Sequence, residues 1–212
     1  AGSNVPDSMD YSEYIDAIHN DMGSAGYPHV SVNRNAEFYG DPANIPAIYS
    51  YIKETQTNNV GISTRGVYDA QTNTINATTD IFFSEDIAKA DYKLVYVVIE
   101  NNVHRTHAET GITNDYCGYD QVNAYAGGAN GAMYGFESLP SIINADSIWY
   151  QDVARLIAPS YKGISNVIGT NSIKEGDHFV NTFTLDMPAT VLKKENTQLV
   201  ALLINSYNQI AN

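Results

Sequence analysis

The chain has 212 residues, of which 43% are apolar and 17% charged, and its formal net charge is −13. This length suits one large domain or two small ones, and the composition is typical of a folded globular protein. Only 11 residues are Lys or Arg, and they form no basic run. The chain therefore lacks the clustered positive charge that binds nucleic-acid phosphates or anionic membrane surfaces.

No apolar stretch is long enough to cross a bilayer, because the longest ones, at 94–99 and 199–204, have the length of a strand. We therefore expect no nucleic-acid partner. We expect contact with a membrane only through a lipid anchor that would lie upstream of this chain.

The segment 1–57 predicts an incomplete α/β unit. Residues 8–22 place apolar side chains at the three- and four-residue spacing of one helix face, and residues 30–32 alternate as in a short strand. Residues 44–55 predict a second helix, with Pro46 in its first turn. Two helices and one strand are too little to close a core. This segment therefore either packs on the rest of the chain or ends a domain whose front lies upstream.

From residue 58 onward the pattern changes to strands that are joined by turns. Residues 60–69 and 74–83 predict a β-hairpin, because turn residues separate two runs of alternating character. The second of these strands would place five side chains on one face, namely Ile75, Ala77, Thr79, Ile81 and Phe83.

Three further strands are predicted. Residues 92–100 are apolar on both faces at their centre, which indicates a strand inside a sheet. Residues 178–187 alternate, and residues 198–205 form a nearly continuous apolar run that favours a buried strand over a short buried helix. Strands joined without intervening helices predict an antiparallel β-sandwich over 58–212.

The interval 101–177 is long and poorly periodic, so we expect it to hold the functional loops of the sandwich. Glycines crowd residues 127–135, but neither G-x-x-x-x-G-K-[ST] nor G-x-G-x-x-G is present. The glycine loop therefore predicts a close-packed irregular connection whose glycines adopt positive φ angles, rather than a phosphate site.

Aromatic side chains gather in the same interval, in a chain that has 16 tyrosines. Rigid amphipathic rings on loops are good anchors for sugars or proteins. The alternative is that these rings fill sandwich edges and the undersides of loops. The ligand-binding candidates are Tyr116, Tyr119, Tyr125, Tyr134 and Trp149.

His104, His107 and Glu109 form a second cluster, with acidic residues and Cys117 soon after it. Two His and a carboxylate can bind zinc or iron, which leaves a metal enzyme as a weaker hypothesis. The spacing is common by chance, however, and a solvated strand-to-loop segment is the favoured interpretation. No G-x-S-x-G is present, and a lone thiol is more often a buried side chain than a nucleophile. We expect no enzyme activity, no metal and no cofactor.

The stretches QVNAYAGGANGAMYGFESLP, VARLIAPSYKGI and QLVALLINSYNQIAN resemble the 28-kilodalton outer-membrane protein family of Gram-negative anaerobes. The resemblance implies that 1–57 is the C-terminal part of a thioredoxin-like α/β domain. It also implies that 58–212 is an immunoglobulin-like β-sandwich with a long loop insertion at about 101–177. Pro28 would hold the cis-proline position. The Cys-x-x-Cys turn that begins a thioredoxin-like domain is missing, so we expect an N-terminally truncated chain.

The resemblance further implies a non-enzymatic protein of the outer membrane or cell surface. Its role would be that of an adhesin or receptor that binds a protein, peptide or glycan through the sandwich loops. The alternative is a thiol–disulfide or folding factor that acts through the thioredoxin-like half, whose redox pair is missing from this chain.

Overall fold

The computed structural model describes residues 31–34, 45–55, 59–111, 119–132, 134–207 and 209–211. The chain divides into two compact units. The sandwich unit consists of the described residues within 11–99, 155–189 and 198–212. The loop unit consists of the described residues within 100–154 and 190–197. Among the described residues, no helix is both long and apolar enough to cross a membrane.

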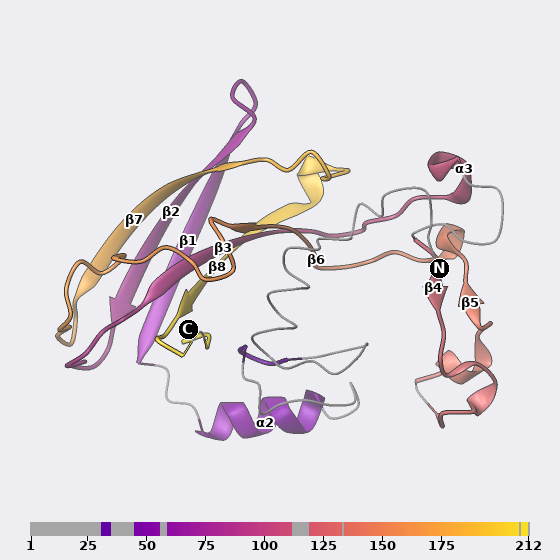
Figure 1. Cartoon of the computed structure of the whole chain (residues 1–212), viewed down its shortest axis with the longest axis horizontal. Coiled ribbons are helices and arrows are strands. Elements are labelled where there is room, and N and C mark those ends of the chain that lie inside the picture. Colours follow the sequence, from indigo (N-terminus) through magenta and orange to yellow (C-terminus); the bar gives the residue numbers. More distant parts are fainter. Residues whose placement is uncertain are drawn as a thin grey trace. The chain divides into compact units, whose positions relative to one another are not determined.

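The first sheet of the sandwich unit has the strand order β1–β2–β7 (Figure 1). Strands β1 (Val60–Asp69) and β2 (Thr74–Phe83) form the predicted hairpin, and β7 (His178–Asp186) pairs antiparallel with the other edge of β2. Burial alternates along β2, so the predicted inward face, from Ile75 to Phe83, is confirmed.

The second sheet has the order β6–β3–β8, with β6 at Val153–Ala158, β3 at Lys93–Glu100 and β8 at Thr197–Ile204. Strand β3 is central, as the apolar run at 92–100 predicts, and β8 is a strand rather than a helix. The consecutive side chains of Leu94, Val95 and Tyr96 are fully buried, which requires that both faces of β3 be covered.

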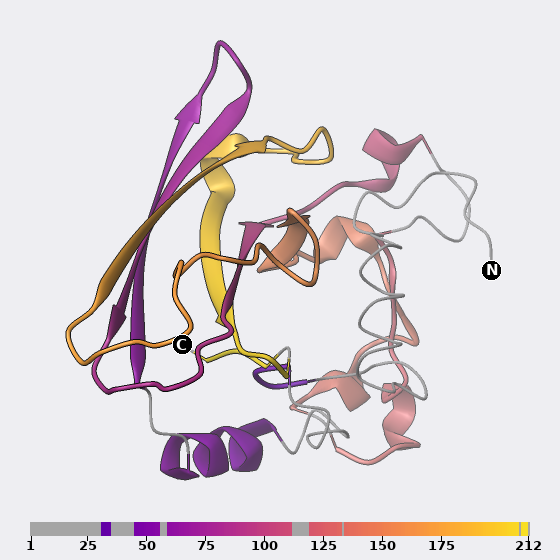
Figure 2. The ribbon, with the colours of Figure 1, turned by 60° about the vertical axis from the view of Figure 1, so that its left-hand side comes forward.

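The two sheets face each other as two layers and enclose the core between them (Figure 2). The ring of Tyr96 on β3 stacks on that of Phe183 on β7, with centroids 5.8 Å apart. The Tyr96 hydroxyl lies 2.9 Å from Oγ1 of the buried Thr79 on β2, so this polar pair is satisfied inside the core. The mostly β, antiparallel character of the prediction is therefore confirmed, whereas its immunoglobulin-like detail stays a prediction.

The front segment is described only in part. The predicted helix at 44–55 is confirmed as α2 (Ile45–Thr55), and it lies beyond one end of the two sheets (Figures 1 and 2). Asn33 accepts a hydrogen bond from the backbone of Ile210, and the Arg34 guanidinium lies 4.1 Å above the ring of Tyr161. At least this short stretch therefore packs on the sandwich unit.

The remaining expectations for 1–57 fall mostly outside the described residues. These are the helix at 8–22, the cis-proline candidate Pro28 and most of the thioredoxin-like segment.

The longest strand that was missed is β6, which lies inside the interval that was expected to hold loops. Its six residues VARLIA contain Arg155, and a charge in so short a run hides the strand pattern. The Arg155 side chain is nevertheless only 1% exposed. The rest of the interval holds short elements, and the peptide bond from Ala158 to Pro159, directly after β6, is cis.

Candidate binding surface in the loop unit

The loop unit has a small apolar centre. Val103, Tyr119 and Ala145 are buried together, and Tyr150 and Val153 pack against them. Two backbone hydrogen bonds of 2.9 Å join Val103 to Tyr150. So small a centre cannot by itself fix the long chain segments around it, and polar contacts carry much of that task.

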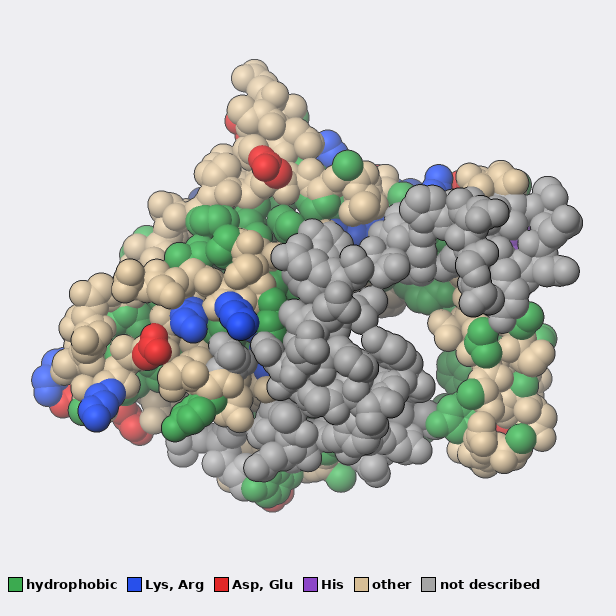
Figure 3. Space-filling model, in the orientation of Figure 1, with side chains coloured by type: hydrophobic (Ala, Val, Ile, Leu, Met, Phe, Trp, Pro, Cys, Tyr) green, Lys and Arg blue, Asp and Glu red, His purple; other side chains and the backbone are tan. Residues whose placement is uncertain are grey.

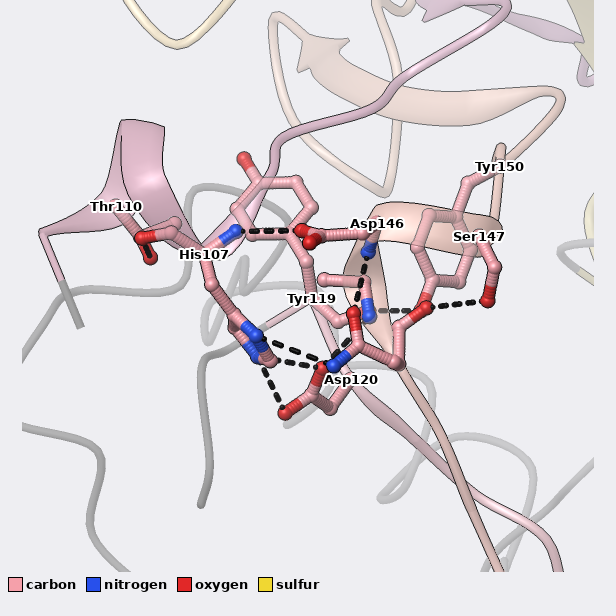
Figure 4. A network of polar contacts seen from close by, with 9 residues as sticks. His107, Thr110, Tyr119, Asp120, Asp146, Ser147 and Tyr150 are labelled. Carbon is pink, nitrogen blue, oxygen red and sulfur yellow. Dashed lines mark hydrogen bonds and ion pairs between the residues drawn. The ribbon is translucent and has the colours of Figure 1, made fainter. Parts of the chain in front are cut away.

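A polar network fixes the segments on either side of this centre (Figure 4). The Asp120 side chain is 1% exposed, and its Oδ1 accepts a 2.7 Å hydrogen bond from the backbone N–H of Ala145. His107 Nε2 lies 3.0 Å from the same carboxylate, and the Asn144 amide approaches His107 Nδ1 at 3.2 Å. The backbone N–H of His107 donates to Asp146 Oδ1 at 2.8 Å.

These contacts tie together three elements that are separate in sequence. They are α3 (His107–Thr110), the residue before β4 (Gln121–Val122), and η4 (Ala145–Ser147). The imidazole of His107 is therefore held between a carboxylate and an amide, and His107 serves here as a connection between loops.

The residues of the metal hypothesis have different partners. His104 Nδ1 lies 2.8 Å from the carbonyl oxygen of Ile148. Glu109 closes a capping box at the start of α3, where the N–H and hydroxyl of Thr106 donate to its carboxylate and lower the pKa of Glu109. Within the part of the chain that the structure describes, no three His, Cys, Asp or Glu side chains form a group that could hold a metal ion. Cys117 lies outside the described residues.

Asn123 organises the glycine loop that comes after β4. Its side chain is nearly buried, and the Nδ2 group donates to the carbonyl oxygens of Phe136 and Pro140 at 2.7 and 3.1 Å. Its Oδ1 accepts a hydrogen bond from the N–H of Tyr125 at 3.1 Å. One amide thus fixes both ends of the loop that connects β4 to β5 (Ile142–Ile143), the two strands of a small antiparallel pair.

The glycines of this loop adopt positive φ angles, as predicted. Gly135 has the largest, at 94°. No atom lies within 4 Å of the place where a Cβ would stand at Gly127, Gly128, Gly131 or Gly135. The expectation of close packing was therefore wrong, because the backbone conformation and not the available space requires these glycines.

The loop unit turns large apolar side chains outward. Val122 and Ile142 lie directly opposite each other on β4 and β5, and both are exposed. Figure 3 shows green side chains over this strand pair, in the region where Figure 1 labels β4 and β5. The exposed set, which we call the apolar face, consists of Val122, Tyr134, Phe136, Leu139, Ile142 and Trp149.

Trp149 is 55% exposed, and one face of its ring is covered. It stacks on the His104 imidazole, with centroids 4.3 Å apart and an interplanar angle of 12°. Because His104 is itself hydrogen-bonded to the carbonyl of Ile148, the indole stacks on a ring that has a polar contact of its own.

The predicted ligand-binding residues have different environments. Tyr134, at 86% exposed, and Trp149 lie on the apolar face. Tyr125 is half-buried at the start of the glycine loop. Tyr119 is 3% exposed and packs in the apolar centre, which matches the alternative that some rings fill the undersides of loops. Tyr116 lies outside the described residues.

Sequence reasoning missed the other four members of the apolar face, Val122, Phe136, Leu139 and Ile142. The candidates it named were tyrosines and one tryptophan. The available signal was the number of large apolar residues in a stretch that has neither helix nor strand periodicity to bury them.

The fold and this surface define a β-sandwich protein with a loop unit that presents an apolar face. The chain belongs to a family described as outer membrane protein Omp28, which matches residues 15–212. The predicted family is therefore confirmed, and with it the outer membrane or cell surface as the location of the protein.

One similar solved structure is HBP35 of Porphyromonas gingivalis, with a TM-score of 0.57 and 16% sequence identity. The likeness covers 92% of this chain and 53% of that one, so the chain spans about half the length of this relative. At this identity the likeness concerns the fold alone. No curated protein matches the chain.

Proposed function

We propose that this protein is a non-enzymatic surface protein, an adhesin or receptor, that binds its partner through the apolar face of the loop unit. The observation that carries this proposal is a concentration of exposed apolar side chains. Of the fourteen large apolar side chains that are exposed among the described residues, six lie between residues 122 and 149. Exposed apolar side chains that are concentrated in one part of a protein commonly mark a site of interaction.

The composition of the apolar face favours a protein or peptide over a glycan as the partner. Three of its members are aliphatic, and three are aromatic. Aromatic and aliphatic side chains form the centres of protein interfaces, whereas a sugar would need hydroxyl-binding groups beside each ring. The net charge of −13 favours a partner with a basic surface, and such attraction weakens as salt increases.

The polar network supports this role because it fixes the loops before a partner arrives. Asp120 and Asn123 are nearly buried and hold their segments with hydrogen bonds of 2.7–3.1 Å. A loop that is already ordered loses less conformational entropy on binding, so more of the contact energy remains as affinity.

A phage-displayed random peptide library, selected on the immobilised protein, tests the proposal. We expect enriched peptides to bind the double variant Tyr134→Ser/Phe136→Ser about tenfold or more weakly, because truncation of an aromatic anchor costs about 1.4 kcal/mol or more. The matched control is Tyr207→Ser, which removes a tyrosine that is 80% exposed on the sandwich unit. If no peptide is enriched, or if both variants bind like the wild type, the proposal fails.

The alternative, a thiol–disulfide or folding factor, stays a prediction, as does the thioredoxin-like front half on which it depends. Insulin reduction by the full-length protein would test it.

A further inference from the structure

A polar pocket of about 370 Å³ lies in the sandwich unit, between two connections that join its strands. One wall is the end of the connection from β2 to β3, with Asp91 and Tyr92. The other wall is the connection from β6 to β7, with Asn166, Thr170 and Asn171. The buried side chains of Ala90 and Ile168 also line it.

Backbone hydrogen bonds hold the two walls together on both sides of the pocket. Ile87 and Ile173 exchange two bonds of 2.9 and 3.0 Å, and Leu94 and Ile164 exchange two of 2.8 and 3.0 Å. Between these bridges, the N–H of Ala90 donates to the carbonyl oxygen of Asn171 at 3.0 Å.

A further bond attaches the second wall to the sheet, since the Asn181 side chain on β7 donates to the carbonyl of Val167 at 2.9 Å. Nearby, Asn166 and Gly169 hold positive φ angles of 63° and 66°. The pocket is therefore formed in advance, which is the usual condition of small-molecule sites.

Several polar side chains in the pocket are available to a ligand. Within the described part of the chain, the side chains of Asp91, Asn166 and Asn171 make no hydrogen bond or ion pair with other residues. The Tyr92 ring contacts that of Phe83, with centroids 5.5 Å apart, and so has a fixed position. The Tyr92 hydroxyl keeps its proton at neutral pH, as an ordinary phenol does, and burial raises its pKa further.

The lining selects the chemistry of the ligand. It contains one carboxylate, two amides, a threonine and an aromatic ring, but neither Lys nor Arg. An anion would meet the Asp91 charge, and no Lys or Arg among the lining residues would offset it. A neutral sugar would find acceptors and donors for its hydroxyl groups and a ring for its apolar face.

We propose that this pocket binds one or two residues of a neutral saccharide. A pocket of this size lies at the small end of ligand sites, which span about 300–1,000 Å³ and so fit a mono- or disaccharide here. This site lies on the sandwich unit and does not depend on the apolar face, so either proposal can fail alone.

Saturation-transfer NMR of the intact chain with galactose, mannose, N-acetylglucosamine and lactose tests this proposal. We expect at least one of these sugars to bind. We expect Asp91→Asn and Asn171→Ala each to weaken that binding about fivefold, which corresponds to about 1 kcal/mol. Both side chains are exposed, and Asn171→Ala keeps the carbonyl that Ala90 uses, so both variants should fold.

The matched control is Asp186→Asn, an exposed aspartate on β7 outside this pocket, which should bind like the wild type. The proposal is overturned if none of the four sugars binds, or if the pocket variants bind as tightly as the control. It is also overturned if galactose 1-phosphate binds more tightly than galactose, because the pocket would then select an anion.

Discussion

The sandwich unit and the loop unit reach stability by different means. In the sandwich unit, two sheets bury aromatic and aliphatic side chains between them, such as Phe83 and Tyr96. In the loop unit only three apolar side chains are buried together, and buried polar groups such as Asp120 and Asn123 bind the backbone of distant segments. The stability of the first unit depends on buried apolar area. The stability of the second depends on a few hydrogen bonds, and the loss of one partner leaves a buried polar group unpaired.

Glu100, at the end of β3, is a second buried carboxylate of the loop unit that binds backbone groups. Its carboxylate is 1% exposed and accepts hydrogen bonds from the backbone N–H groups of Leu192 and Lys193, at 3.0 and 2.6 Å. The loop unit therefore uses a buried carboxylate in a second place to hold a turn, as Asp120 holds η4. Such groups stabilise only while every partner is present.

The largest effect is expected in the sandwich core. Phe83→Ala should lower the free energy of unfolding by about 3–5 kcal/mol, because it leaves a cavity between the sheets. Its neighbour Phe82 points outward and is 40% exposed, so Phe82→Ala should cost less than about 1 kcal/mol. Urea unfolding followed by far-UV circular dichroism measures both. Equal costs for the two variants would contradict the assignment of the inward face.

The next largest loss of stability should be confined mainly to the loop unit. Asp120→Ala should destabilise the loop unit by about 2–3 kcal/mol, because the N–H of Ala145 and the His107 ring lose their buried acceptor. Trp149, the only tryptophan, lies in the loop unit, so its fluorescence reports on that unit. We expect the fluorescence transition to move to lower urea concentration while the circular dichroism transition moves less.

The control for this experiment is Asp146→Ala, which removes an exposed carboxylate that accepts one hydrogen bond, from the N–H of His107. Its cost should stay near about 1 kcal/mol. If Asp120→Ala shifts both spectroscopic transitions equally, the loop unit does not have a separate polar support.

Replacing a glycine with alanine should have opposite effects on stability in the two units. Gly135→Ala in the loop unit places a Cβ on a residue with φ of 94°, which costs about 1–2 kcal/mol. Gly61→Ala lies on an exposed position of β1, where a Cβ would be 3.8 Å from Phe82, and should stabilise slightly, by up to about 1 kcal/mol. Melting temperatures of both variants provide the test, and a stabilising Gly135→Ala would show that this loop has another conformation.

The smallest effects on stability are expected when exposed charged side chains are replaced. Lys174 donates to Asp86 at 2.7 Å and is the main cause of the lowered pKa of Asp86, with the N–H of Glu175 second. A lowered carboxyl pKa contributes stability above its ordinary value of 3.8, and that contribution is lost as pH falls through the lowered pKa. Asp86→Asn should therefore reduce the loss of melting temperature between neutral and acid pH.

Glu109 is the counterpart of Asp86 in the loop unit, because the backbone N–H of Thr106 lowers its pKa. Glu109→Gln should likewise reduce the loss of melting temperature between neutral and acid pH. We expect this change in the transition followed by Trp149 fluorescence rather than in the one followed by circular dichroism. An acid dependence unchanged by either variant would show that these exposed contacts contribute nothing measurable.

The sandwich could be predicted from the sequence because its strands repeat a simple pattern. The alternation from Ile75 to Phe83 gives the inward face of β2, and the apolar run at 92–100 gives a central strand. Strand β6 could not be recognised, because Arg155 interrupts its apolar run and becomes buried only through contacts that the sequence does not encode locally.

The loop unit could be predicted only as a region. Most of it lies in the poorly periodic interval 101–177, although residues 155–177 belong to the sandwich unit and residues within 190–197 also belong to the loop unit. Two of its exposed rings, Tyr134 and Trp149, were candidates because aromatic residues are frequent in that interval. The contacts of Asp120 and Asn123 do not, because they join residues 13–25 positions apart with no period between them. Tyr119 shows the same limit, since nothing in its neighbouring residues tells a buried ring from an exposed one.

Hydrogen-exchange mass spectrometry, with and without a saturating phage-selected peptide, tests most directly whether the apolar face binds the partner. We predict slower exchange in fragments that cover 119–150, and unchanged exchange in β1, β2 and β7. Slower exchange confined to the sandwich strands, with 119–150 unaffected, would contradict the assignment of binding to the loop unit.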